Sequence, residues 1–207
     1  MVVNGCWAEG SYFTTAIRQQ YPAFFLDWNN HCSSDQDGVD LAAVIDKGIS
    51  AGLRIDTNRI YLTGFSQGGS GSYKILRGMI SKGKNIAGLI RVAGASESVL
   101  PDESVAKTSV WYHVGLKDEA LRIQVANDAY AYVKNDALNA SAAETTVTDA
   151  AGSWARTTKT LTKNGIPIFR LSSYPAADHR PDPAYALPQD AGLDVFDWLF
   201  AQSLACR

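Results

Sequence analysis

The hexapeptide GFSQGG, residues 64–69, joins an apolar stretch to an amphipathic one with almost no linker between them. The preceding residues 59–63 (RIYLT) are apolar and β-branched enough for a buried parallel strand. From Gly69 onward, apolar side chains recur at helical spacing, at Tyr73, Ile75, Leu76, Met79 and Ile80. The sequence therefore predicts a strand, a sharp turn and a helix, with Ser66 at the apex of the turn.

This turn restricts both the backbone and the chemistry of Ser66. A residue held at so short a join adopts a sparsely populated backbone conformation. Gly64 and Gly68 match the glycines of the pattern G-x-S-x-G, where the missing Cβ atoms let strand and helix approach closely. The helix N-terminus would supply unpaired N–H groups and a partial positive charge. The arrangement suits a nucleophilic serine, and the alternative is a plain helix N-cap.

Strand and helix patterns alternate along the rest of the chain. Strands are expected at residues 2–4, 23–28, 59–63, 86–94, 109–115 and 166–174, and helices at 12–20, 39–50, 119–133 and 194–204 besides the one after Gly69. This alternation predicts an α/β fold with a doubly wound, mostly parallel sheet of about six strands. We expect the 207 residues (1–207) to form one domain. The Thr-rich residues 139–165 are either a surface hairpin or a long ordered loop.

Composition excludes some classes of protein and leaves others open. The formal charge of −2 gives no electrostatic reason to expect nucleic acid or a membrane surface as a partner. No apolar run is long enough to cross a bilayer. The three cysteines, Cys6, Cys32 and Cys206, permit one disulfide or three plain thiols, and the absence of C-x-x-C argues against a zinc site. The chain opens directly into strand-like sequence, which fits either a cytosolic protein or a secreted one whose leader is absent.

A nucleophilic serine needs a base, and the chain has three histidines. His179 follows the last expected strand and precedes the closing helix, in agreement with the order Ser, Asp, His. His113 lies within an expected strand and His31 lies ahead of the serine. We predict His179 as the base for Ser66.

The acid that orients this base is expected after the strand at residues 109–115. Asp118 is our choice there, and its neighbour Glu119 is expected to start a helix, where a carboxylate is favoured. Asp178 adjoins His179 in sequence, and adjacent residues rarely form the required hydrogen bond. Asp178 is therefore interpreted as solvated.

An oxyanion hole requires two backbone donors, and two sites in the sequence can supply them. One is the N–H of Gln67, directly after the serine. The other is expected in the loop after the first strand, from Cys6, with Trp7 as second choice. Trp7 and Trp28 lie at the catalytic ends of two strands, where they are candidates for substrate contact, with core packing as the alternative for Trp28.

Together these motifs resemble an α/β-hydrolase. GFSQGG, the HVGLKD loop at residues 113–118 and the late histidine carry this resemblance. More narrowly, VVNGCW and RIDTNRIYLTGFSQGG resemble polyhydroxybutyrate depolymerases and related feruloyl esterases, most specifically over residues 3–7 and 54–69. Cutinases are similar in size and in their G-x-S-Q-G turn.

The resemblance also implies where the chain departs from its relatives. Asn4 stands where the family has a histidine before the oxyanion glycine. We expect a minimal fold in which the first strands of the full fold are missing or have been cut away and no lid is present. In related secreted esterases cysteines near these positions can be oxidised, so the resemblance allows a Cys6–Cys32 disulfide and implies a secreted protein.

These features predict a serine carboxylic-ester hydrolase with a Ser66–His179–Asp118 triad. Its expected substrates are aryl, short-chain or polyester-type esters, either small molecules or polymers, and no metal or organic cofactor is expected. One alternative is a peptidase or amidase on the same fold. The other is a non-catalytic binding module, to which the departure at Asn4 lends some support.

Overall fold

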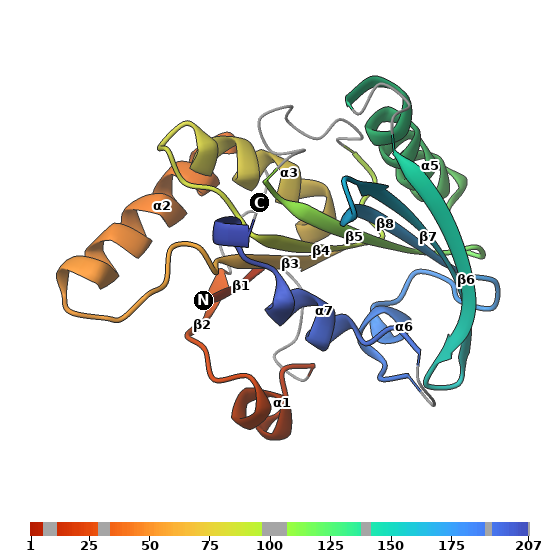
Figure 1. Cartoon of the computed structure of the whole chain (residues 1–207), viewed down its shortest axis with the longest axis horizontal. Coiled ribbons are helices and arrows are strands. Elements are labelled where there is room, and N and C mark those ends of the chain that lie inside the picture. The colour runs from red at the N-terminus through yellow and green to blue at the C-terminus, as the bar shows by residue number, and fades with distance from the viewer. Residues whose placement is uncertain (6–11, 29–33, 97–106, 138–141, 189–191, 207) are drawn as a thin grey trace.

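An eight-stranded sheet with the order β2-β1-β3-β4-β5-β8-β7-β6 forms the centre of the computed structural model (Figure 1). The structure describes residues 1–5, 12–28, 34–96, 107–137, 142–188 and 192–206. The strands are β1 (Val2–Gly5), β2 (Phe25–Trp28), β3 (Tyr61–Phe65), β4 (Gly88–Val92), β5 (Ser109–Gly115), β6 (Ala143–Ala151), β7 (Trp154–Lys163) and β8 (Ile166–Tyr174). All pairings from β2 to β8 are parallel, which confirms the prediction of a mostly parallel sheet.

Helices cover both faces of this sheet (Figure 1). On one face lie α2 (Asp35–Ser50), α3 (Gln67–Ile80) and α5 (Ala120–Tyr132), and on the other lie α1 (Thr15–Gln20), α6 (Asp182–Tyr185) and α7 (Val195–Ala201). Strand residues alternate between two apolar layers: Leu62 joins the layer beneath α2 and α3, and Tyr61 joins the layer beneath α7. The two layers fix the sheet from both sides, as in a doubly wound fold.

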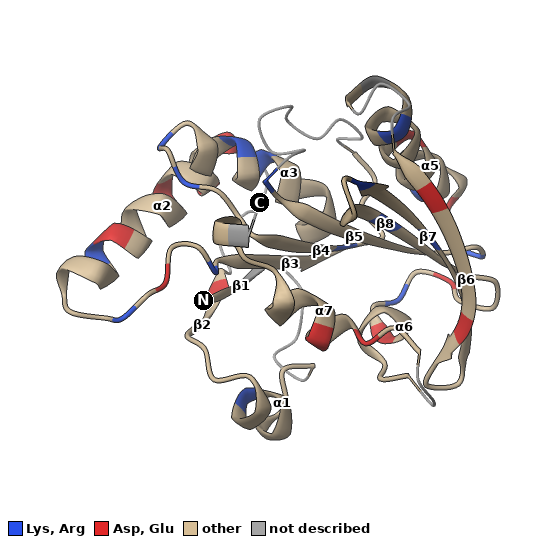
Figure 2. Ribbon diagram, in the orientation of Figure 1, with Lys and Arg blue, Asp and Glu red and all other residues tan. Residues whose placement is uncertain are grey.

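None of the helices in the described ranges combines the length and the apolar character that a bilayer crossing requires. Figure 2 shows acidic and basic residues mixed along α2.

The Thr-rich segment is a hairpin, the first of its two predicted forms, and it extends the sheet. Strands β6 and β7 pair antiparallel around Gly152, which has a positive φ of 56°, and β7 pairs antiparallel with β8. The Arg156 guanidinium binds the Asp149 carboxylate through two N–H groups, at 2.8 Å and 2.5 Å, and also donates to the Leu193 carbonyl at 2.7 Å. These bonds tie the hairpin to the segment before α7. The pairing of β7 with β8 adds the two strands of the hairpin to the sheet, which then has eight strands.

Helix α2 begins at Asp35, four residues before its predicted start. The Ser34 N–H donates to the Asp37 carboxylate at 3.0 Å, which is one half of a capping box. Two acidic residues, Asp35 and Asp37, then lie in the first turn, where the helix dipole favours them. The polar cap therefore stabilises a first turn of α2 that the spacing of apolar residues in the sequence does not indicate.

Helices α2 and α3 touch through their backbones. A Cβ atom at Gly38 would lie 2.1 Å from the Ile75 carbonyl oxygen, and one at Gly78 would lie 1.9 Å from the Asp35 carbonyl oxygen. Only glycine allows such an approach, so these two positions fix the helix whose first turn follows Ser66.

We therefore expect Gly78→Ala and Gly38→Ala each to lower the free energy of unfolding by at least about 3 kcal/mol, because a backbone cannot yield as a side chain does. Gly48→Ala in α2 is the matched control, since its Cβ would meet only the side-chain ends of Ile55 and Leu53. That control should change stability by no more than about 1 kcal/mol. Urea unfolding midpoints measure all three, and equal losses in the three variants would contradict the backbone contact.

Candidate active site

Three loops at the carboxyl edge of the sheet carry the residues predicted from the sequence. Ser66 directly follows β3, Asp118 lies three residues after β5, and His179 lies five residues after β8. Because β3, β4, β5 and β8 are parallel neighbours, their carboxyl ends meet at one edge. The topology thus collects side chains that are 113 residues apart in the chain.

The imidazole of His179 bridges the other two side chains. Its Nε2 atom lies 2.9 Å from the Ser66 hydroxyl oxygen, and its Nδ1 atom lies 2.9 Å from Oδ2 of Asp118. The Asp118 side chain is 0% exposed, whereas that of His179 is 36% exposed. The arrangement places a dry carboxylate behind an imidazole that solvent and other molecules can reach.

Ser66 has the strained backbone that its turn predicts. Its φ and ψ angles are 57° and −112°, in a region that residues with a side chain rarely occupy. The Ser66 N–H donates to the Val92 carbonyl at 3.0 Å, and the Ser66 carbonyl accepts from the Ser70 N–H at 2.9 Å. A Cβ atom at Gly69 would lie 2.4 Å from the Val92 oxygen, so the turn and β4 are in backbone contact.

Backbone bonds join the loop of Asp118 to the loop of His179. The Leu116 N–H donates to the Tyr174 carbonyl at 3.0 Å, and the Lys117 N–H donates to the Ala177 carbonyl at 2.9 Å. A Cβ atom at Gly115 would lie 2.4 Å from the Ala177 oxygen, so this contact requires glycine. The two loops therefore act as one support for the Asp118–His179 pair.

Asp178 is exposed to solvent, as the sequence predicts, whereas Glu119 is the N-cap residue of α5 and not a residue of its first turn. The Asp178 carboxylate accepts from Nη2 of Arg180 at 3.0 Å, and this bond lowers the pKa of Asp178 below its ordinary value. Glu119 precedes α5 and its side chain is exposed. Neither carboxylate competes with Asp118 for the imidazole.

Phe65 has a role that sequence analysis did not identify. Its ring lies against that of His179, with centroids 4.7 Å apart and an interplanar angle of 31°. Apart from the position of Phe65 next to Ser66, the sequence does not indicate this contact, because it joins residues that are 114 positions apart. The contact limits the rotation of the imidazole.

The predicted oxyanion donors are only partly described. Gln67 is the first residue of α3, so its N–H is one of the helix's unpaired donors. Gly5 pairs with Gly64, which brings the end of β1 beside the Ser66 turn.

The predictions for Cys6, Trp7 and a Cys6–Cys32 disulfide lie outside the described residues, as does His31. Trp28 is half-buried and packs against the core layer beneath α2 and α3.

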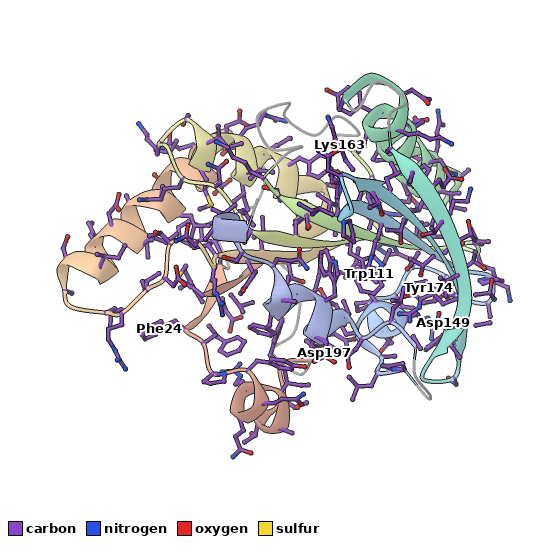
Figure 3. The ribbon with its side chains drawn as sticks, viewed as in Figure 1. Phe24, Trp111, Asp149, Lys163, Tyr174 and Asp197 are labelled. Atoms are coloured by element: carbon purple, nitrogen blue, oxygen red, sulfur yellow. The ribbon has the colours of Figure 1, made fainter. Side chains whose placement is uncertain are left out.

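His113 is buried between the rings of Trp111 and Tyr174, and Trp111 belongs to the apolar layer that also contains residues of α6 and α7. Figure 3 labels Trp111 and Tyr174. The ring of His113 stacks on Trp111 with centroids 5.1 Å apart, and its Nδ1 lies 2.9 Å from the Tyr174 hydroxyl. Burial holds the pKa of His113 well below its ordinary value of 6.5, and nearby Arg156 lowers it further. His113 is therefore a neutral structural residue at physiological pH.

Metal ligands do not gather in the part of the chain that the structure describes: it contains no group of three or more His, Cys, Asp or Glu side chains placed to hold an ion.

A parallel sheet flanked by helices, with a strained serine after β3 and an acid and a histidine after later strands, defines the α/β-hydrolase fold. No protein-family model matches the chain, and neither does any curated protein sequence.

Solved structures match the chain at low sequence identity. An acetyl xylan esterase from Aspergillus awamori matches with a TM-score of 0.55 and 14% identity, over 86% of this chain and 82% of that chain. SOBER1 from Arabidopsis thaliana matches with a TM-score of 0.48 and 14% identity, over 89% and 92% of the two chains. Esterase PE8 matches with a TM-score of 0.48 and 13% identity, over 97% and 88%. The first of these likenesses supports the α/β-hydrolase fold.

The buried neutral His113 predicts a specific dependence of stability on pH. Its pKa is lower in the folded state than in the unfolded state, so the unfolded chain binds the extra proton as the pH falls below about 6.5. This residue should then cost up to about 1.4 kcal/mol of stability per pH unit. We expect His113→Asn to be less stable than wild type at about pH 8 but to lose less stability down to about pH 5.

Urea unfolding of both proteins across this range measures the difference. All other titrating groups are common to the two proteins, so the difference in slope isolates His113. Parallel stability profiles would show that the histidine does not titrate on unfolding.

Proposed function

We propose that this chain is a serine carboxylic-ester hydrolase in which Ser66 is the nucleophile, His179 the general base and Asp118 the orienting acid. The observation that carries the proposal is the imidazole of His179, which lies 2.9 Å from the Ser66 hydroxyl and 2.9 Å from the Asp118 carboxylate. Nucleophile, base and orienting group within hydrogen-bond reach are the geometric signature of nucleophilic catalysis.

The proposed reaction is a two-step acyl transfer. The Ser66 oxygen attacks the ester carbonyl carbon while Nε2 of His179 takes the hydroxyl proton. Asp118 holds the other ring nitrogen in its N–H form and stabilises the imidazolium. The imidazolium then protonates the departing alkoxide, which leaves as the alcohol. Water then attacks the acyl carbon while His179 takes its proton. As the bond from the acyl carbon to the Ser66 oxygen breaks, the imidazolium returns that proton to Ser66 and the carboxylic acid leaves.

The negative charge of each tetrahedral intermediate needs donors beside the serine. We assign them to the N–H groups of Gln67 and Cys6, with Trp7 as the second choice for the latter. The position of Gln67 at the N-terminus of α3 supports the first assignment, because the helix dipole favours an anion there. The pairing of Gly5 with Gly64 supports the second, because it places the end of β1, the residue before Cys6 in the sequence, beside the serine turn.

The proposed substrates are aryl, short-chain or polyester-type esters. The 36% exposure of the His179 side chain supports access by bulky acyl or alcohol groups. Trp7 and Trp28 are the proposed substrate contacts, from the ends of β1 and β2. The likeness in fold to an acetyl xylan esterase supports including acetyl esters among the substrates.

We further propose that residues 1–207 are one hydrolase domain and that the protein is secreted, as the motif resemblance implies.

The proposal predicts turnover of p-nitrophenyl acetate or butyrate that Ser66→Ala lowers by at least about 10³-fold, because the hydroxyl is the attacking group. Ser50→Ala, at the exposed end of α2, is the matched control and should keep full activity. A fluorophosphonate should label the wild type at Ser66 alone.

A panel of acetyl, butyryl and hydroxycinnamoyl esters, polyester films and matched anilides then assigns the substrate class. Wild-type protein that neither hydrolyses any ester nor accepts the label at Ser66 would overturn the proposed function. Faster release from anilides than from matched esters would make the chain an amidase.

A further inference from the structure

Arg122, in the first turn of α5, contacts both the Asp118 carboxylate and the backbone beside the serine turn. Its Nε lies 3.5 Å from Oδ1 of Asp118, and its Nη1 donates to the Ala93 carbonyl at 2.8 Å. The side chain is only 16% exposed. A planar guanidinium with several fixed donors suits such a double contact, whereas an ammonium group has no matching fork.

The segment reached by Arg122 also holds the nucleophile turn. Ala93 follows Val92, whose carbonyl accepts the Ser66 N–H at 3.0 Å. The Ala95 N–H donates to the Ser70 hydroxyl at 2.8 Å, which ties the first turn of α3 to the same segment. Ala93 itself has a positive φ of 49°, so this short segment is strained and depends on its bonds.

The two carboxylate oxygens of Asp118 have different partners. Oδ1 accepts the Glu119 N–H at 2.7 Å and faces the guanidinium, whereas Oδ2 faces His179 at 2.9 Å. A carboxylate that is 0% exposed is stabilised by a nearby cation and by hydrogen-bond donors. Arg122 supplies the cation without occupying the oxygen that binds the imidazole.

We propose that Arg122 is a positioning residue for the catalytic pair: it links the Asp118 loop to the Ala93 segment and so fixes the acid and base relative to the serine. This inference rests on the proposed function of Ser66, Asp118 and His179. Arg122 acts through Asp118 and the backbone, without touching substrate. Its loss should therefore slow the acyl-transfer step and leave substrate binding almost intact.

The test compares Arg122→Met and Arg122→Lys with wild type on the p-nitrophenyl ester that the wild type hydrolyses best. We expect Arg122→Met to lower kcat by about 10- to 100-fold with a change in KM below about threefold, because small displacements of catalytic groups cost rate rather than binding. Arg122→Lys keeps the charge but lacks the fork, so it should recover only part of kcat. Added guanidinium ion, below denaturing concentrations, should partly restore Arg122→Met.

Arg77→Met is the matched control. Arg77 also pairs with an aspartate, Asp35, at 3.0 Å, but that pair joins α3 to α2 away from the acid loop. Its removal should leave kcat unchanged. Fluorophosphonate titration of each variant counts the folded active sites, and if Arg122→Met does not fold, Arg122→Gln takes its place in the series.

A double-mutant cycle with Asp118→Asn decides whether Arg122 acts through the carboxylate. In the Asp118→Asn background, Arg122→Met should lower kcat by less than about threefold, since coupled residues are not additive. The same fold-loss in both backgrounds would overturn the action of Arg122 through the Asp118 carboxylate. An unchanged kcat in Arg122→Met, or a rise in KM alone, would overturn the positioning role as a whole. Each of these outcomes requires an active wild type, whereas an inactive wild type overturns the proposed function itself.

Discussion

The structure depends on backbone contact between the serine turn and its neighbours. A Cβ atom at Gly64 would lie 2.5 Å from the Gly68 carbonyl, and one at Gly69 would lie 2.4 Å from the Val92 oxygen. Without side chains at these points, β3 turns into α3 within one residue, and that residue takes a positive φ. A strained residue of this kind costs about 1–3 kcal/mol, which the packing of the surrounding helix and strand must offset. Buried apolar side chains of α3, among them Tyr73, Ile75 and Leu76, supply that packing.

The rest of the site is built by the order of the strands. Because β4 separates β3 from β5, the serine and the acid do not lie on adjacent strands. The end of β4 and the residue after it bridge this gap: the Val92 carbonyl accepts the Ser66 N–H, and the Ala93 carbonyl accepts from the Arg122 guanidinium. Beyond β5, the acid loop and the histidine loop are joined through Gly115 and Ala177. Rigid strands therefore hold every part of the site, and the side chains need few adjustments to meet.

The sequence predicted the features that depend on local pattern. The strand ends and the spacing of Ser66, Asp118 and His179 indicated three side chains that the structure places within hydrogen-bond distance, and their catalytic roles stay predictions. The place of the hairpin β6–β7 in the sheet was not predictable, because its Thr-rich strands show little apolar alternation and pair with distant residues. Arg122 was missed although an aspartate and an arginine four residues apart suggest an ion pair. Nothing local indicates that this arginine also reaches Ala93.

The burial of Asp118 and the nearby cation of Arg122 have opposite effects on the imidazolium of the proposed reaction. A dry carboxylate attracts the imidazolium more strongly than a solvated one would, since the attraction rises as the local dielectric falls. The cation of Arg122 works against this gain, because it repels a positive imidazole. The two effects are separated in space: the guanidinium faces Oδ1 and the imidazole faces Oδ2. The Nε of Arg122 lies 3.5 Å from Oδ1 of Asp118 and also 3.5 Å from Oε2 of Glu119, so the guanidinium charge is shared between two carboxylates. The chain thus retains a fixed acid at a modest electrostatic cost, and the strong bond of Arg122 goes instead to the neutral carbonyl of Ala93.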